Sequence, residues 1–97
     1  MAQVVFSPEA LADLERLTEF LIEKSPEAAV DTLGLVLDAT RILASHPMVG
    51  RRVEGEMREL VISRGNSGYL GLYVFDPARD VVRVLRLRHQ REAGYRE

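Results

Sequence analysis

The amino-acid sequence predicts an α+β fold with the element order β-α-α-β-β-β, in which a helical hairpin packs on one face of a mostly antiparallel sheet. A short run of β-branched and aromatic residues opens the chain, two Ser-Pro-Glu helix starts follow, and three runs of strand length fill the second half. Short connections between the last three runs indicate adjacent antiparallel strands. The first strand is expected to return and pair in the same sheet.

The first strand and the first helix are separated by a helix start signal. Residues Gln3 to Phe6 have strand composition and stop at Ser7-Pro8-Glu9, where a serine N-cap precedes a proline at the first helical position. The helix is expected to run to about Lys24. Its buried stripe is predicted from helical spacing as Leu11, Leu14, Leu17 or Thr18, and Leu21. Charged residues such as Asp13 are assigned to the remaining, solvent-facing surface.

The second helix begins with the same signal, Ser25-Pro26-Glu27, and Pro47 closes it just after His46. Its apolar stripe is predicted as Val30, Leu33, Val36 or Leu37, Thr40, and Leu43 or Ala44. Two consecutive helices joined this tightly are expected to form an antiparallel hairpin.

The hydrophobic period changes to that of strands after the turn-rich segment Met48 to Arg52. Glu59 to Arg64, Tyr69 to Asp76 and Val81 to His89 have strand length and strand composition. They are split by Gly65-Asn66-Ser67-Gly68 and by a second turn centred on Pro77. Tyr69 and Tyr73 are most simply explained as packing residues within the sheet.

Length and composition indicate one domain that spans residues 1–97. The chain is 46% hydrophobic and has no cysteine, so packing alone must hold the fold, and thiol catalysis and cysteine-ligated zinc are excluded. The N-terminus has no signal-peptide pattern, and no stretch is long and apolar enough to span a membrane. We therefore expect a cytoplasmic protein without a membrane partner.

The net charge of -2 hides an asymmetry between the two halves of the chain. Residues 1–50 have three basic and eight acidic side chains, whereas residues 51–97 have ten arginines and seven acids. Arg86 and Arg88 are two residues apart on a strand, so both are expected on the sheet face that the helices leave open, with Leu85 and Leu87 on the other side. Guanidinium groups bind phosphate or carboxylate bidentately, although two arginines can also merely solvate an exposed face.

Motifs for cofactor binding and for several catalytic chemistries are absent from the sequence. It contains no phosphate-binding GxxxxGK[ST] loop, no His/Asp/Glu cluster at metal-ligand spacing, and no G-x-S-x-G nucleophile motif. We expect neither a cofactor nor a metal.

A family resemblance is carried by motifs that span essentially the whole chain. These are His46-Pro47, Gly50-Arg51-Arg52, Arg58-Glu59-Leu60, Gly68-Tyr69 before a Tyr73-containing strand, and Leu85-Arg86-Leu87-Arg88-His89-Gln90-Arg91-Glu92-Ala93-Gly94-Tyr95. The chain resembles the RelE/ParE superfamily of toxins, also labelled plasmid stabilisation proteins. The resemblance implies a type II toxin–antitoxin system, in which a cognate antitoxin forms a complex with the toxin. The complex contacts operator DNA only through the antitoxin.

Members of this superfamily divide by target, and the resemblance implies different site residues for each. RelE-like toxins cleave messenger RNA on the ribosome without metal, whereas ParE-like toxins are associated with inhibition of DNA gyrase. If the chain is a ribonuclease, the catalytic positions fall on Arg64, Arg88, His89, Arg91 and Tyr95, with Arg58 as a further basic candidate on the same strand as Arg64. Cleavage at a ribose 2′-hydroxyl needs a base, cations for the charged phosphorane, and an acid for the leaving oxygen.

One departure from the ribonuclease pattern favours the second target. RelE-like ribonucleases have an arginine directly after a Gly-Tyr pair, but here Gly68-Tyr69 is followed by Leu70. An apolar side chain neither binds nor polarises a phosphate. We therefore expect a non-enzymatic gyrase inhibitor, with Arg86, Arg88, His89, Arg91 and Tyr95 as target contacts.

Two other hypotheses stay open. One is a metal-independent, ribosome-dependent endoribonuclease in which His89, whose imidazole titrates near neutrality, acts as acid or base. His89 can equally cap the strand by hydrogen bonding or contact the antitoxin. The other hypothesis is an antitoxin-bound regulatory module without toxicity.

Overall fold

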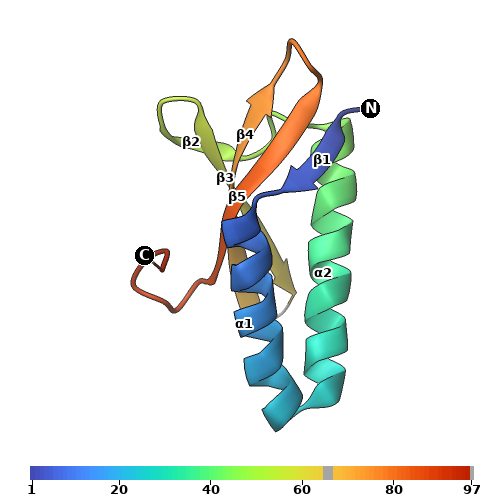
Figure 1. The fold of residues 1–97 in the computed structure, drawn as a ribbon, viewed down its shortest axis with the longest axis vertical. Coiled ribbons are helices and arrows are strands. Elements are labelled where there is room, and N and C mark those ends of the chain that lie inside the picture. The colour runs from blue at the N-terminus through green and yellow to red at the C-terminus, as the bar shows by residue number, and fades with distance from the viewer. Residues whose placement is uncertain (65–66, 97) are drawn as a thin grey trace.

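The computed structural model describes residues 1–64 and 67–96, except for the side chains of residues 63, 64 and 67. Its elements, in chain order, are β1 (Gln3–Phe6), α1 (Pro8–Lys24), α2 (Pro26–Ser45), β2 (Arg51–Glu54), β3 (Met57–Arg64), β4 (Ser67–Asp76) and β5 (Val81–His89). Figure 1 shows α1 and α2 as an antiparallel hairpin on one side of the sheet. The predicted α+β architecture is thus confirmed, with one strand more than expected.

The five strands form one sheet in the order β1-β5-β4-β3-β2. β1 pairs in parallel with β5, and every other neighbouring pair is antiparallel. The first strand therefore pairs in the same sheet as predicted. The helical hairpin that follows β1 crosses one face of the sheet before the chain enters the remaining strands. α1 packs against β5 and α2 against β3, so the helices cover one face and leave the other open.

Both helices start where the sequence predicts, and the side chains show why. Ser7 Oγ accepts a hydrogen bond from Ala10 N at 3.0 Å, and Ser25 Oγ accepts one from Ala28 N at 3.3 Å. Each serine thus satisfies a backbone donor that has no partner within its helix. The proline that follows each serine begins the first turn.

The core lies between the hairpin and the sheet. Tyr73, Leu87 and Val82 are its largest fully buried side chains. The hydroxyl of Tyr73 accepts a hydrogen bond from Gly50 N at 2.8 Å, and the hydroxyl of Tyr69 lies 3.3 Å from Thr32 Oγ1. The packing role predicted for both tyrosines is confirmed, and each buried phenol has a polar partner.

The predicted stripe of α2 is partly wrong. Its buried residues are Ala29, Thr32, Val36, Ala39 and Leu43. Val30, Leu33 and Leu37 are exposed, because the helix is rotated so that smaller side chains face the sheet and allow a close approach. The stripe of α1 has a similar exception in Leu11, which is also exposed.

Strand β2 was not predicted, because its first two residues belong to the segment Met48 to Arg52, which was expected to form a turn. All four of its residues are exposed, so no alternation of apolar and polar residues marks it. It forms because Gly55, at φ +53°, makes a tight turn that brings Arg51 opposite Glu59. β3 accordingly begins at Met57, two residues before the predicted start, and β4 begins at Ser67.

Candidate functional site

The open face of the sheet is the side away from the helices, and its residues follow from the strand register. Val61, Leu70 and Arg88 form one row across β3, β4 and β5, and Glu59, Leu72 and Arg86 form the next. Tyr69, Gly71 and Tyr73, which alternate with Leu70 and Leu72 along β4, are buried on the helix side. The prediction that Arg86 and Arg88 share a face is therefore confirmed.

Glu59 is the buried acidic centre of this face, with only 7% of the residue exposed. Its Oε1 accepts a hydrogen bond from Arg51 Nη2 at 3.0 Å, and its Oε2 accepts one from the hydroxyl of Tyr95 at 2.7 Å. Burial alone would raise the pKa of Glu59. The hydrogen bonds from Tyr95 and Arg51, and the charges of Arg51 and Arg88, outweigh burial and lower the pKa.

Arg88 and Tyr95 lie against each other beside this carboxylate. The guanidinium carbon of Arg88 is 5.2 Å from the centre of the Tyr95 ring, and Arg88 Nη1 donates to the carbonyl oxygen of Glu92 at 2.7 Å. Arg88 Nε is buried and has no hydrogen-bond partner among the described residues. Burial and the hydrogen bond to Glu59 raise the pKa of Tyr95, so this phenol keeps its proton.

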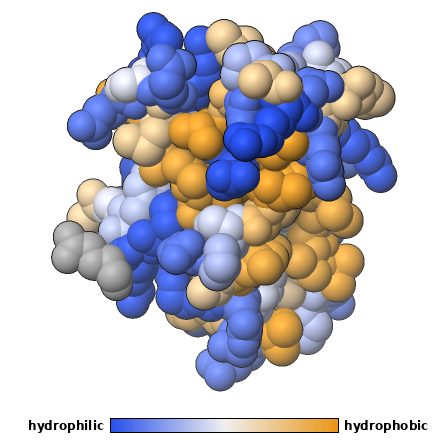
Figure 2. Space-filling view, turned by 45° about the horizontal axis from the view of Figure 1, so that its top comes forward, coloured by the Kyte–Doolittle hydropathy of each residue, from blue (hydrophilic) through white to orange (hydrophobic). Residues whose placement is uncertain are grey.

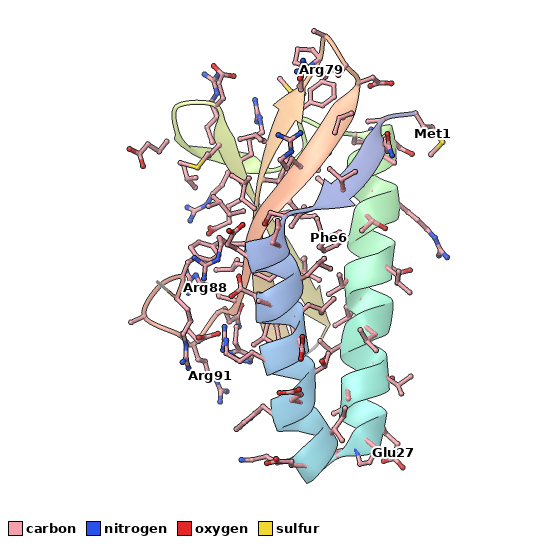
Figure 3. All side chains as sticks on the ribbon, in the orientation of Figure 1. Met1, Phe6, Glu27, Arg79, Arg88 and Arg91 are labelled. Atoms are coloured by element: carbon pink, nitrogen blue, oxygen red, sulfur yellow. The ribbon has the colours of Figure 1, made fainter. Side chains whose placement is uncertain are left out.

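The C-terminal segment after β5 is fastened by Glu92. One oxygen of this carboxylate accepts from His89 N at 3.0 Å, and the other lies 3.3 Å from Arg16 Nη1 and 3.5 Å from Arg96 Nε. Figure 3 shows Arg88 and Arg91 on the same side of the molecule, where this segment passes α1. The tail is thus held against both the sheet and the first helix.

Arg86 contacts α1 and is not free on the sheet surface. Asp13 Oδ2 accepts from Arg86 Nε at 2.8 Å and from Leu87 N at 2.9 Å, while Asp13 Oδ1 accepts from Arg86 Nη2 at 3.2 Å. Burial would raise the pKa of Asp13, but these hydrogen bonds and the charges of Arg86 and Arg16 lower it. The assignment of Asp13 to the solvent-facing surface of α1 was wrong, because only 4% of the residue is exposed.

His89 and Arg91 lie apart from the cluster of Arg88, Tyr95 and Glu59. The ring of His89 packs edge-on against Tyr69 at 5.1 Å, which places it on the helix side of the sheet. His89 Nδ1 accepts a hydrogen bond from Arg91 N at 3.0 Å, in agreement with the strand-capping alternative. Arg91 is exposed, and its side chain has no ion pair among the described residues.

The two basic candidates on β3 have different outcomes. Arg58 Nη1 donates to the carbonyl oxygens of Met48 and Gly50, at 3.0 Å and 2.8 Å, and so closes the segment before β2. It lies opposite Tyr73 in the register, on the helix side. The side chain of Arg64 lies outside the described residues.

Comparison with known proteins assigns the chain to a family. The family model described as the ParE toxin of the type II toxin–antitoxin system parDE matches residues 4–94. The chain belongs to the ParE toxin family.

Similar sequences and structures agree with this membership. Toxin RelE3 of Caulobacter vibrioides is 38% identical over 92 residues, which cover 95% of this chain and 98% of that protein. Toxin RelE2 of the same organism is 35% identical over 89 residues, or 92% of this chain and 96% of that protein.

Solved structures of toxin–antitoxin complexes share the fold. A chain of the chromosomal ParDE TA system from P. aeruginosa has a TM-score of 0.72 at 18% identity, with coverage of 92% of this chain and 96% of that chain. A chain of the RelBE2 toxin–antitoxin complex from Mycobacterium tuberculosis has a TM-score of 0.63 at 23% identity, covering 94% and 93%. The family model and the two Caulobacter relatives show that the chain is a type II toxin of the ParE/RelE family.

In this ParE-family chain, Glu59 and Asp13 were not predicted as site residues. A lone glutamate in an amphipathic strand is typical of a solvated position, and nothing local identifies its partners. Glu59 and Leu70 share a sheet face with Arg88, and this shared face could have pointed to Glu59. It can be recognised only once the strand register is known.

The described part of this toxin offers no site for a metal. No group of three His, Cys, Asp or Glu side chains among residues 1–64 and 67–96 could hold an ion. Within the same ranges, neither helix is long and apolar enough to cross a membrane.

Proposed function

We propose that this toxin inhibits DNA gyrase and is neutralised in the cytoplasm by a cognate antitoxin, through which it also reaches operator DNA. Membership of the ParE family supports the assignment. The structural neighbours named as ParDE and RelBE complexes support an antitoxin partner. Gyrase, as opposed to messenger RNA, is favoured by the chemistry of the open face.

The observation that carries the choice of target is the position of Leu70. Its side chain lies between Val61 and Arg88 on the open face. The resemblance to RelE-like ribonucleases implies an arginine at this position, where a cation would stabilise the charged phosphate. The other open-face residues at the centre of β4, Leu72 and Val74, are also aliphatic. Single-stranded RNA is held by aromatic stacking and cations, whereas aliphatic side chains beside arginine are typical of a contact with protein.

The ionisable groups of the face support a non-enzymatic inhibitor. A general base or acid works best when its pKa lies near the operating pH. Glu59 has a lowered pKa and accepts two hydrogen bonds, and Tyr95 has a raised pKa, keeps its proton and donates a hydrogen bond to Glu59. In this arrangement the two groups stabilise each other and neither is poised for proton transfer.

The alternative function is a metal-independent, ribosome-dependent mRNA endoribonuclease. The names of the two Caulobacter relatives, RelE3 and RelE2, favour it. So does the proximity of Arg88, Tyr95 and Glu59, which places a cation, a phenol and a carboxylate within one cluster. Movement of the tail would free Tyr95 and Arg88 for a phosphate, with Arg64, His89 and Arg91 as the other candidates.

Induction of the toxin without antitoxin, followed by assays of both targets, tests the proposal. Purified toxin should block DNA supercoiling by gyrase, and induced cells should form filaments with a DNA damage response. Cleaved messages, translation arrest and unaffected supercoiling would support the endoribonuclease instead. Normal growth with a folded protein would indicate a regulatory module without toxicity.

Arg91→Ala is the variant that best separates target binding from folding, because the exposed Arg91 side chain has no ion pair among the described residues. We expect it to abolish growth arrest while the protein still folds and binds its antitoxin. Arg79→Ala is a matched control, since Arg79 is also exposed but lies in the turn between β4 and β5. Growth arrest by Arg91→Ala at the wild-type level would remove Arg91 from the target site.

A further inference from the structure

The segment that follows β5 lies over the open face of the sheet. Tyr95 Oη donates a hydrogen bond to Glu59 Oε2 at 2.7 Å, and the Tyr95 ring lies 5.2 Å from the guanidinium carbon of Arg88. Glu59 and Arg88 belong to neighbouring rows of the open face, so Tyr95 covers part of both rows. We call residues 92–96 the C-terminal strap.

The C-terminal strap is held by polar contacts and has no fully buried residue. From Gln90 to Arg96 the chain forms neither helix nor strand, and each residue is exposed or only partly buried. Figure 2 shows mainly hydrophilic side chains on the left side of the molecule, where Figure 1 places the segment after β5. Segments with few buried apolar contacts open at low cost in free energy. The strap can therefore open without unfolding the sheet beneath it.

Arg88 lacks an anionic partner beneath the C-terminal strap. In the neighbouring row, Arg51 pairs with Glu59 at 3.0 Å, and Arg86 pairs with a carboxylate of α1 at 2.8 Å. Arg88 instead donates to a neutral acceptor, the backbone carbonyl of Glu92, and its Nε is buried without a partner among the described residues. A buried donor without an acceptor is costly, and a carboxylate that accepts from Nε and one Nη of Arg88 would satisfy it.

The neighbours of Arg88 in its row on the open face are aliphatic. Leu70 lies beside it in the register, and Val61 follows in the same row and is 60% exposed. Aliphatic side chains beside one unpaired guanidinium match a protein segment with an acidic residue between aliphatic ones. A nucleic-acid backbone has a charge at every phosphate and is held by several cations and by aromatic stacking. This row therefore suits a single carboxylate better than a chain of phosphates.

We propose that Arg88, Leu70 and Val61 bind an acidic side chain flanked by aliphatic residues on the target protein, and that this segment displaces the C-terminal strap. The inference rests on the proposed function, in which the target is gyrase, and adds the chemistry of the contact and the movement that admits it. The carboxylate accepts hydrogen bonds from Arg88 in place of the carbonyl oxygen of Glu92. Arg91 precedes the strap, so the displacement leaves it exposed for the target contact proposed above.

The C-terminal strap thus competes with the target for the open face. When a ligand binds only the open form, its apparent dissociation constant is the intrinsic value divided by the open fraction. Tyr95→Phe removes the hydrogen bond to Glu59 but keeps the ring, so it raises the open fraction. We therefore expect Tyr95→Phe to bind gyrase about fivefold more tightly than the wild type, whereas loss of an ordinary contact residue weakens binding.

The affinity of full-length toxin variants for purified gyrase tests this competition. Tyr69→Phe is the matched control for Tyr95→Phe, because the Tyr69 hydroxyl faces Thr32 on the helix side, and it should leave the affinity within about twofold. Arg88→Gln should weaken binding by about tenfold or more, whereas Arg79→Gln, in the turn between β4 and β5, should not change it. Arg88→Lys should lie between Arg88→Gln and the wild type, since it keeps the charge but not the planar fork.

A titration with small probes tests the chemistry without gyrase. The probes are acetyl-Leu-Glu-Leu-amide, the matching peptide with Gln in place of Glu, and a short oligouridylate. Nuclear magnetic resonance follows the side-chain Nε–H signal of Arg88, which moves when a carboxylate pairs with it. The Glu peptide should move this signal and speed amide exchange in the C-terminal strap, whereas the Gln peptide should do neither.

Two results with gyrase would overturn the inference and leave gyrase as the target: unchanged affinity of Arg88→Gln, or weaker binding by Tyr95→Phe. Failure of the wild-type toxin to bind gyrase would overturn the proposed function. Movement of the Arg88 signal by the Glu peptide would then still support a protein ligand at this row. Equal effects of the two peptides would overturn the inference, and so would an oligouridylate that moves the signal at lower concentration than the Glu peptide.

Discussion

Removal of the Asp13 carboxylate should be among the most destabilising single changes in this toxin. Asp13 lies on α1 with 4% of the residue exposed, and it holds β5 through two donors of Arg86 and the backbone N–H of Leu87. β1 pairs with β5 only from Val81 to Val84. Beyond the end of that pairing, the Asp13 carboxylate accepts the hydrogen bond of the β5 backbone at Leu87. Asp13→Ala therefore removes three hydrogen bonds and leaves a buried amide without an acceptor.

The expected cost is about 3 kcal/mol of unfolding free energy. A buried N–H without a partner costs about 1–3 kcal/mol, and breaking one side of a buried ion pair costs about 3–5 kcal/mol. The lower part of this range applies, because the Arg86 side chain is 23% exposed and water can partly solvate its charge. Small domains unfold with about 5–15 kcal/mol, so the loss is a large fraction of the total.

Urea unfolding followed by circular dichroism at pH 7 measures this loss. Asp38→Ala is the matched control, because Asp38 pairs with Arg41 at 3.3 Å but its side chain is 57% exposed, and such pairs contribute at most about 1 kcal/mol. Asp13→Ala/Arg86→Ala should be more stable than the sum of its single changes predicts, since both partners are then absent. A cost for Asp13→Ala no larger than that for Asp38→Ala would refute the reasoning.

Gly50→Ala should lower the urea midpoint by the equivalent of about 1–3 kcal/mol, because a Cβ there would lie 2.7 Å from the ring of Tyr73 and 2.8 Å from the carbonyl oxygen of Glu59; an unchanged midpoint would contradict this packing. Tyr95→Phe removes the donor to Glu59 but keeps the ring beside Arg88, so it should cost about 1–2 kcal/mol and speed amide exchange in the tail, whereas unaltered exchange would argue against the contact. The lowered pKa of Glu59 contributes stability above its unfolded value of about 4.3, and this contribution is lost as pH falls through the folded pKa. Glu59→Gln should therefore flatten the loss of stability below about pH 4, and an equally steep loss would exclude Glu59 as its source.

The fold was predictable because its signals are local. Each Ser-Pro-Glu start supplies both the cap and the first helical residue. Strands β3 and β4 contain apolar runs, and β5 has apolar residues interrupted by arginines. β2 was not predictable, because four exposed residues have no period of their own and pair only where Gly55 turns the chain. The position of a strand can be read from its own residues only when one of its faces is buried.

The candidate site was predictable only in part, since its contacts join distant segments. That Arg86 and Arg88 share a face follows from spacing alone, and the register confirms it. Their partners do not follow from spacing: Asp13 is 73 residues from Arg86 in the chain, and Tyr95 is 36 residues from Glu59. A polar residue beside a helical stripe is usually solvated, so the burial of Asp13 could be inferred only with β5 in place.

The arginine-rich half of the chain therefore has less free positive charge than its composition suggests. Arg51 and Arg86 each pair with a buried carboxylate, Arg58 binds backbone carbonyls, and Arg88 lies under the ring of Tyr95. Long-range attraction of nucleic acid depends on clustered charge that is not already neutralised. Of these four arginines, Arg51 and Arg86 are neutralised by a carboxylate, and Arg58 and Arg88 are held by contacts within the chain. The sheet therefore presents less free positive charge to nucleic acid than the ten arginines of residues 51–97 suggest.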